Sequence, residues 1–115
     1  MVLVCLLVLV LTVFPAALHT VSGTSMYPRI QPGQVVIVNR YAYFFSQPEI
    51  NDVLVFRQPD SGRLMIKRVS AIADGPVYYV TGDNSQESLD SRHFGVLTRD
   101  TIIGRVELLG EQRER

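Results

Sequence analysis

DVLVFRQPDSGRLMIKRVSAI, residues 52–72, contains two runs of hydrophobic and β-branched residues on either side of a polar turn. The first run, residues 52–57, and the second, residues 63–72, are each typical of a β-strand. The Pro and Gly between them supply the backbone angles that a tight turn needs. This stretch therefore predicts a β-hairpin.

Three further strands are predicted outside the hairpin. The segments QVVIVNR (residues 34–40), VYYVT (77–81) and TIIGRVELL (101–109) are short, apolar and bounded by turn residues. Short strands separated by turns are typical of mostly β folds. We therefore expect one small antiparallel domain over residues 22–110, with the form of a partly open β-barrel. The charged tail at residues 111–115 is expected to lie outside it.

The N-terminal stretch, residues 1–18, contains no charged residue. As a helix it would be roughly 27 Å long, close to the thickness of about 30 Å of a bilayer core. We expect residues 1–21 to form a single transmembrane helix that anchors the domain. A cleaved signal peptide is an alternative, but the stretch lacks a positively charged start. A buried core helix is a second alternative, but such a helix should have a polar face and this stretch has none.

The composition excludes several classes of protein. The formal net charge is zero and no basic stripe is present, so we do not expect nucleic acid as a partner. Cys5 is the only cysteine, which rules out an intramolecular disulfide and leaves no pattern typical of a zinc site. We expect no metal and no other cofactor.

Ser25 is one candidate nucleophile, because it lies in a turn-rich segment between Gly23 and Pro28. Gly23 allows a positive φ or a close backbone approach, and a rigid turn can present both a hydroxyl and backbone N–H groups. A histidine base for such a serine would have to be His19 or His93, the only two histidines. A plain turn without chemistry is the alternative.

Lys67 is the other candidate base. Alternation along its strand places Lys67 on the same face as Met65 and Val69. An amine that apolar neighbours keep from water loses its charge more readily, and a neutral amine can accept a proton from a serine hydroxyl. The alternative is a lysine that extends its ammonium group into solvent from a half-exposed strand.

Four short motifs follow one another along the chain. They are SMYP at residues 25–28, DVLVFR at 52–57, IKRV at 66–69, and GDN at 82–84 followed by SLDSRHFG at 88–95. In this order, behind an apolar N-terminal segment, the motifs resemble those of the type I signal peptidase family. The resemblance covers nearly the whole chain.

The resemblance implies a role for each matching residue. Ser25 would be the nucleophile of an acyl-enzyme mechanism, Lys67 its general base, and Ser88 the residue that orients the lysine amine. The backbone N–H groups of Ser25 and Gly23 would form the oxyanion hole. Structural roles near the site would fall to Met26, Pro28, Arg68, Asp90 and Arg92. Asp90 and Arg92 would hold the loop, and Arg68 is a possible partner for them.

The family also implies a function and a location. The chain would be a membrane-bound serine endopeptidase that removes signal peptides from exported preproteins. Its partners would be those signal peptides and the lipid bilayer. It would cross the cytoplasmic membrane once, with the catalytic domain on the outer face. The aromatic residues within 41–45 would then contact the membrane interface, unless they belong to the core.

The sequence also departs from the family's pattern. The interval between residues 66–69 and 82–84 is too short for the large inserted domain of many bacterial signal peptidases, which indicates a minimal catalytic core. Two other functions therefore stay open. One is a dedicated maturation protease of the same fold with a single precursor, such as that of nickel superoxide dismutase. The other is a membrane-tethered module that binds peptides without cleaving them.

Overall fold

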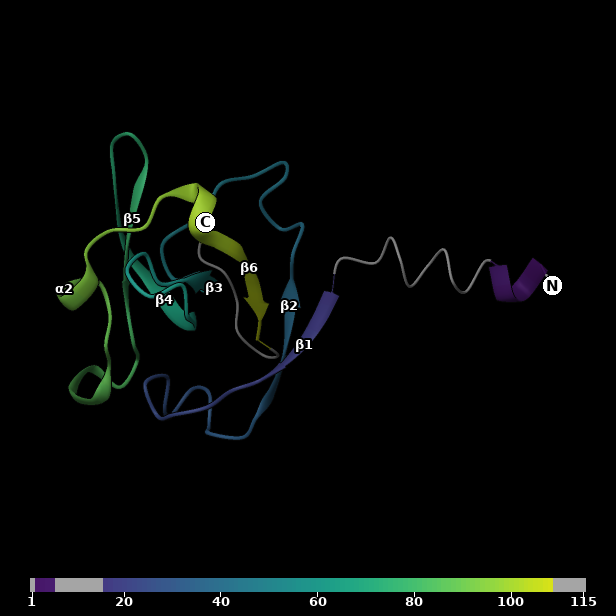
Figure 1. Cartoon of the computed structure of the whole chain (residues 1–115), viewed down its shortest axis with the longest axis horizontal. Helices are drawn as coiled ribbons and strands as arrows, with labels where there is room; N and C mark the ends of the chain where they lie inside the picture. The colour runs from purple at the N-terminus through teal and green to yellow at the C-terminus, as the bar shows by residue number, and fades with distance from the viewer. Residues whose placement is uncertain (1, 6–15, 109–115) are drawn as a thin grey trace.

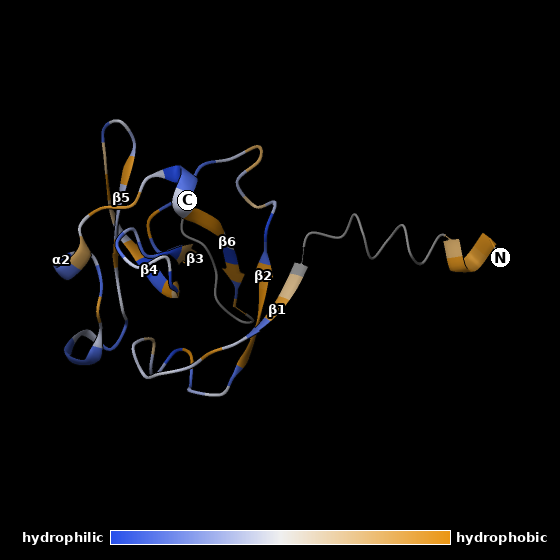
Figure 2. Ribbon diagram, viewed as in Figure 1, coloured by the Kyte–Doolittle hydropathy of each residue, from blue (hydrophilic) through white to orange (hydrophobic). Residues whose placement is uncertain are grey.

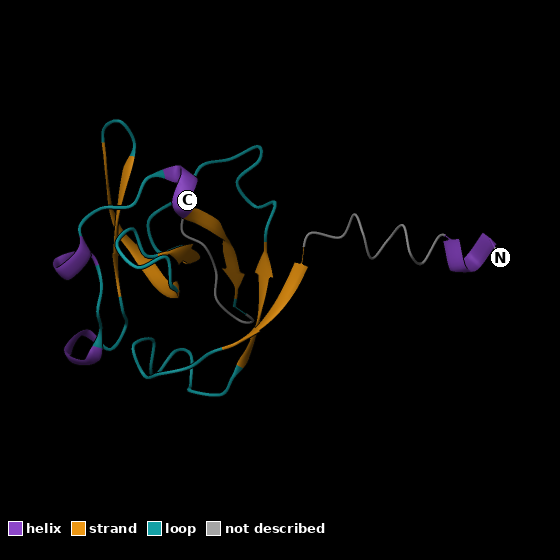
Figure 3. Ribbon diagram, in the orientation of Figure 1, coloured by secondary structure: helices purple, strands orange, loops and turns teal. Residues whose placement is uncertain are grey.

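The structure is a computed structural model that describes residues 2–5 and 16–108. Its main feature is one six-stranded antiparallel sheet in the order β1-β2-β6-β3-β4-β5 (Figure 1). The strands are β1 (Ala16–Thr20), β2 (Val35–Asn39), β3 (Val53–Arg57), β4 (Leu64–Ala73), β5 (Val77–Thr81) and β6 (Ile102–Glu107). Three helical turns, η1 (Ser85–Glu87), α2 (Ser91–Phe94) and η2 (Arg99–Thr101), connect β5 to β6 (Figure 3).

The five strands predicted from the sequence are confirmed as β2 to β6, each with bounds close to those expected. The predicted hairpin is β3–β4, paired from Val53–Arg68 to Arg57–Leu64. The sheet does not close, because β1 and β5 are edge strands in the described part of the chain. The prediction of a mostly β, antiparallel fold is thus confirmed. The described strands form an open sheet, so the expected barrel form is not confirmed.

β1 corrects the predicted boundary of the N-terminal anchor. Residues 16–20, which the sequence analysis includes in the anchor, form a strand that pairs with β2 from Ala16–Asn39 to Thr20–Val35. An apolar run does not by itself distinguish a helix from a strand, and here β2 provides backbone groups that need partners. Val2–Cys5 is helical, and residues 6–15 of the expected anchor lie outside the described residues. Within residues 2–5 and 16–108, no helix has the length and apolar character to cross a bilayer.

β3 is buried on both faces and separates two apolar clusters. Val53 and Val55 pack with Met26, Ile30 and other residues on one face, and Leu54 and Phe56 pack on the other face. The second cluster also contains Val69, Tyr78, Val80 and Leu97. Figure 2 shows the hydrophobic colour along the strands in the middle of the sheet. The loops that carry the predicted site extend from this rigid centre.

Candidate active site

The predicted nucleophile lies in a loop between β1 and β2, residues 22–33, which we call the Ser25 loop. Two backbone hydrogen bonds close its base: Val21 N donates to the Gln34 carbonyl at 2.8 Å and Gly33 N donates to the Val21 carbonyl at 2.8 Å. Gly23 has φ +79°, a value that side chains with a Cβ rarely adopt. The expectation that Gly23 supplies a positive φ is therefore confirmed.

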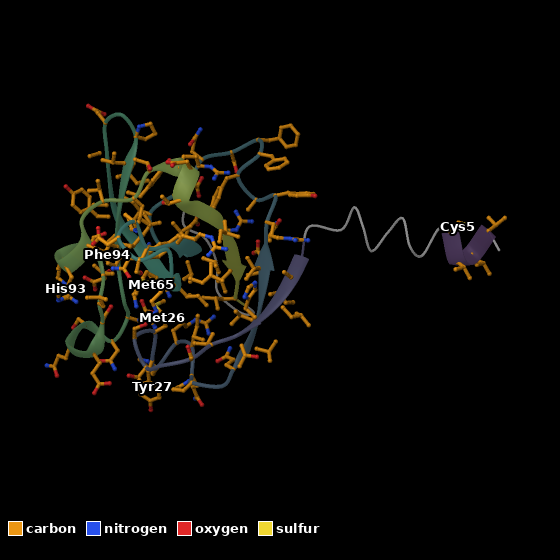
Figure 4. The ribbon with its side chains drawn as sticks, in the orientation of Figure 1. Cys5, Met26, Tyr27, Met65, His93 and Phe94 are labelled. Carbon is orange, nitrogen blue, oxygen red and sulfur yellow. The ribbon has the colours of Figure 1, made fainter. Side chains whose placement is uncertain are left out.

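Apolar side chains fix the Ser25 loop to the sheet. Met26 is 1% exposed and Ile30 is fully buried, and both belong to the cluster around Val53 and Val55. A backbone hydrogen bond joins these two residues, because Ile30 N donates to the Met26 carbonyl at 2.9 Å. Pro28, which follows a cis peptide bond, is exposed. The residue next to Ser25 is thus held in the core while Ser25 itself stays half-buried. Figure 4 labels Met26 and its neighbour Tyr27, which is 49% exposed.

Lys67 lies in the middle of β4, opposite Leu54 of β3, and only 3% of its surface is exposed. Its alternation partner Val69 is fully buried, as the sequence predicts. Burial lowers the pKa of the Lys67 ammonium below 10.5, and the nearby negative charge of Asp90 opposes that effect. Desolvation has the larger influence, so the amine is more easily neutralised than an ordinary lysine.

Gly82 brings the third predicted site residue close to the first. A Cβ at this position would lie 2.2 Å from Ser88 Oγ and 2.6 Å from the Ser25 carbonyl oxygen. Such distances are far below van der Waals contact, so only glycine fits between the two serines. Gly82 begins the Ser88 loop, which we define as residues 82–95.

Three hydrogen bonds connect the tip of the Ser88 loop to the Ser25 loop. Asn84 N donates to the Ser25 carbonyl at 2.8 Å, and Asn84 Nδ2 donates to the Thr24 carbonyl at 3.1 Å. Thr24 Oγ1 donates to the Glu87 carboxylate at 2.6 Å. Sequence reasoning missed Thr24 and Glu87, because 63 positions separate them and neither stands out locally.

Asp90 and Arg92 form an ion pair at the base of the Ser88 loop. Arg92 Nε and Nη2 each donate to the Asp90 carboxylate at 2.8 Å, and Gly82 N donates to it at 3.2 Å. Asp90 is fully buried, which by itself would raise its pKa. The hydrogen bonds from Arg92 and Gly82 outweigh burial and hold the pKa of this carboxyl well below its usual range.

Arg68 pairs with a carboxylate that the sequence analysis did not consider. Its Nε donates to Asp83 Oδ1 at 2.9 Å and its Nη2 to Asp83 Oδ2 at 3.0 Å. This bidentate pair links β4 to the start of the Ser88 loop. Asp83 lies directly after Gly82, so this pair holds the first residues of the Ser88 loop against the strand that carries Lys67.

Ser88 is buried, with 8% of its surface exposed. Its hydroxyl is close enough to Asp90 to contribute to the lowered pKa of that carboxyl. Its Oγ nevertheless meets the geometry of a hydrogen bond with none of the residues described in 2–5 and 16–108. A buried hydroxyl without a partner is costly, so this group is available to a nearby donor or acceptor.

Ser25 and Lys67 both line one open cleft of about 540 Å³. It is lined by residues 19–26, which include Gly23, and by residues 63–67, together with Val55, Glu87 and Leu89. Of the two histidines, His19 of β1 also lines this cleft. His93 does not line it: its Nδ1 accepts a hydrogen bond from Asp90 N at 3.2 Å and completes a capping box at the start of α2.

The comparisons with known proteins identify the family of the chain. The model of the family described as "Signal peptidase, peptidase S26" matches residues 1–77 and 72–109. The chain therefore belongs to the signal peptidase S26 family, which includes the type I signal peptidases that the motifs resemble.

Individual relatives come from chloroplasts and bacteria. Thylakoidal processing peptidase 1 of Arabidopsis thaliana is 26% identical over 75% of this chain and 39% of its own length. Probable signal peptidase I-1 of Synechocystis is 28% identical over 85% of this chain and 72% of its own length. Signal peptidase I V of Bacillus subtilis is 24% identical over 75% of this chain and 80% of its own length. The chain thus spans about two fifths of the thylakoidal peptidase.

Proposed function

We propose that this chain is a serine endopeptidase that removes signal peptides from exported preproteins, with Ser25 as nucleophile and Lys67 as general base. One observation carries the proposal: a half-buried serine on a firmly anchored loop and a buried lysine with a lowered pKa line the same cleft. Family membership supports the reaction class, because the matched family is that of signal peptidases.

The chemistry follows from the state of the lysine. A neutral Lys67 amine accepts the Ser25 hydroxyl proton while Ser25 Oγ attacks the carbonyl carbon of the scissile peptide bond. The tetrahedral intermediate then collapses, the C–N bond breaks, and the leaving amine takes the proton from Lys67. A water molecule, activated by the same amine, hydrolyses the acyl-enzyme and restores Ser25. Ser88, whose buried Oγ has no partner among the described residues, would orient the amine.

The Ser25 loop also offers donors for the developing oxyanion. The Ser25 N–H makes no hydrogen bond to a backbone carbonyl within the described part of the chain. The positive φ of Gly23 turns the backbone just before Ser25. We assign the oxyanion hole to the backbone N–H groups of these two residues, which need no reorganisation during the reaction.

The cleft suits a peptide in extended conformation. Residues 64–67 of β4 pair with β3 on one side, and β5 pairs with β4 only from Arg68 onward. Within the described residues, the other backbone edge of 64–67 has no strand beside it, and residues 63–67 line the cleft. An extended peptide can add to such an edge by backbone hydrogen bonds, which would bring its scissile bond to Ser25.

For location, we propose a single membrane anchor before β1 and a catalytic domain on the outer face of the cytoplasmic membrane. The uncharged residues 1–18 support the anchor, although the span must end before Ala16 because β1 begins there. A binding module without catalysis has no need of a buried lysine, whose desolvation costs stability.

The test uses the full chain in detergent and a preprotein with an Ala-x-Ala cleavage site. Mass spectrometry of the products should show one cut after the second Ala, and the Ser25→Ala and Lys67→Ala variants should show none while they keep the wild-type melting transition. Undiminished cleavage by either variant would rule out the proposed dyad. Cleavage confined to a single natural precursor would favour the dedicated maturation protease.

A further inference from the structure

Arg63 lines the candidate cleft at a distance from the proposed dyad. It comes directly before Leu64, the first residue of β4, and four positions before Lys67. At about 3.3 Å per residue, this spacing places the backbone of Arg63 roughly 13 Å from that of the proposed base. Burial lowers the pKa of Lys67, whereas an arginine keeps its charge in proteins. Arg63 therefore supplies a permanent positive charge at the end of the cleft remote from the dyad.

The turn before Arg63 has a fixed backbone. Gln58 N donates to the Arg63 carbonyl at 2.8 Å, and Gly62 N donates to the Gln58 carbonyl at 2.8 Å. Side chains close the turn further, since Arg57 Nη1 donates to the Gly62 carbonyl at 3.0 Å and Ser61 Oγ donates to Gln58 Oε1 at 2.7 Å. When Arg63 binds a ligand, only its side chain has to be ordered, which keeps the entropic cost of binding low.

The guanidinium group of Arg63 has no partner among residues 2–5 and 16–108. In the same part of the chain, every other arginine has a hydrogen bond, an ion pair or another electrostatic contact. Some bind carboxylates, as in the pairs Arg68–Asp83, Arg92–Asp90 and Arg105–Glu107. Those arginines stabilise the fold, whereas the exposed Arg63 is available to a molecule in the cleft.

The recognition pattern of the proposed substrate determines which of its residues reaches Arg63. In Ala-x-Ala the two alanines are two positions apart, which is the spacing of side chains on one face of a β-strand. The part of the substrate before the scissile bond therefore suits the free edge of residues 64–67, with residue −1 beside Lys67. Four residues further along an extended peptide, a residue near position −5 lies beside Arg63.

Glu87 lies at the opposite end of the cleft from Arg63. The Ser88 loop, which carries Glu87, begins directly after β5, and β5 pairs with β4 only from Arg68, one residue beyond Lys67. Glu87 also accepts the hydrogen bond from Thr24 of the Ser25 loop. A carboxylate on the substrate is thus attracted at the Arg63 end and repelled at the Glu87 end.

We propose that Arg63 is a specificity-determining residue, which binds an acidic side chain about five residues before the scissile bond of the substrate. This inference rests on the proposed function and names a substrate class within it: preproteins with Asp or Glu near position −5. A guanidinium group can bind such a carboxylate through two parallel hydrogen bonds. The contact is remote from the reacting atoms, so it should act mainly on KM.

The test uses the full-length protein in detergent and Ala-x-Ala peptides that differ at one position. Asp and Asn are compared at −5, because their side chains have nearly the same shape and only Asp is charged. We expect kcat/KM to be about two- to fivefold higher for the Asp peptide, as for an exposed ion pair, mostly through a lower KM. This advantage should disappear in 1 M salt, where the Debye length is about 3 Å. At position +2, near the Glu87 end, Asp should have no advantage over Asn.

Variants of the turn assign the preference to one side chain. In Arg63→Gln, the ratio of kcat/KM for the Asp and Asn peptides at −5 should fall to about one, and in Arg63→Glu it should fall below one. Asp60→Asn is the matched control, because Asp60 is exposed on the same turn and does not line the cleft. It also changes the net charge by one unit, and it should keep the wild-type ratio.

Three results would overturn the proposal. They are a wild-type ratio of one at −5, a ratio that Arg63→Gln leaves unchanged, and an equal advantage of Asp at −5 and +2, which would reflect only the overall charge of the peptide.

A binding measurement separates this inference from the proposed function. A wild-type chain that cleaves no peptide would contradict the proposed function. The affinities of fluorescein-labelled Asp and Asn peptides for the Ser25→Ala protein, measured by anisotropy, would then decide the role of Arg63. The Asp peptide should bind about two- to fivefold more tightly, as for an exposed ion pair, and equal affinities would contradict the site.

Discussion

The two loops that meet at the candidate site are fixed by different forces. The Ser25 loop is anchored by the apolar side chains of Met26 and Ile30 in the core. The Ser88 loop is anchored by the buried Asp90 carboxylate, which binds Arg92 and the Gly82 amide. Apolar burial does not depend on protonation, whereas a carboxylate loses its ion pair in acid. The stability of the Ser25 loop should therefore be insensitive to pH, whereas that of the Ser88 loop should fall in acid.

The contact between the loops is the most sensitive point of this comparison. In Gly82→Ala, the added methyl group would collide with Ser88 Oγ and the Ser25 carbonyl, so the loops must separate. A displacement of about 1 Å at a catalytic group can cost about a hundredfold in rate, and we expect kcat/KM to fall by at least that factor. Steady-state cleavage of an Ala-x-Ala peptide measures it. Ser85→Ala, an exposed position of the same loop, is the control and should keep wild-type activity.

Met26→Ala tests the apolar anchor. Removal of a buried methionine side chain that is 1% exposed should lower the free energy of unfolding by about 2–5 kcal/mol. Because no ionisable group is removed, the loss should be the same at pH 7 and pH 3. Denaturant titration at both pH values measures it. A loss that depends strongly on pH would show that the two loops are not anchored independently.

Asp90→Asn tests the polar anchor. The charge-assisted hydrogen bonds to Arg92 suggest a loss of about 1.5–3 kcal/mol at neutral pH. The pKa of Asp90 is lower in the folded protein than its ordinary value of 3.8, so its stabilisation is present above that pH and disappears as the pH falls further. The difference between wild type and variant should therefore shrink below about pH 4. A difference that is constant from pH 7 to pH 2 would contradict the role of the carboxylate.

Glu87→Ala should have the smallest effect on stability, because Glu87 is exposed and only accepts hydrogen bonds from Thr24 Oγ1 and, at 3.3 Å, from Asn84 Nδ2. We expect a loss of about 0.5–1.5 kcal/mol. The catalytic consequence should be a lower kcat with a nearly unchanged KM, since the bond positions the residue before Ser25. Glu87→Gln retains an acceptor and should restore most of kcat. A change in KM alone would indicate that Glu87 contacts substrate instead.

The local features of the molecule could be predicted from sequence. Alternation along residues 63–72 indicated both the strand and the face that Lys67 shares with Met65 and Val69, because the side chains of a strand alternate whatever it packs against. Gly23 was expected to allow a positive φ or a close backbone approach, and the structure shows the positive φ. These inferences need only neighbouring residues.

The features that depend on contacts between distant residues could not be predicted from the sequence. β1 was missed because an apolar run is compatible with a helix or a strand until its partner, here β2, is known. The Thr24–Glu87 hydrogen bond and the Arg68–Asp83 pair join residues far apart in the sequence, and no spacing rule connects them. Charge alone suggested a contact between Arg68 and the Asp90–Arg92 unit, but it did not indicate the pair of Arg68 with Asp83.

The pH dependence of kcat/KM is the measurement that tests the Lys67 base most directly. The free enzyme must contain a neutral amine, so kcat/KM should rise with pH through one ionisation below 10.5, the ordinary lysine value, because burial lowers the pKa of Lys67. Lys67→Ala should be inactive throughout, and His19→Gln should keep the wild-type profile although His19 lines the same cleft. An ionisation that disappears in His19→Gln but persists in Lys67→Ala would show that the histidine, and not the lysine, is the base.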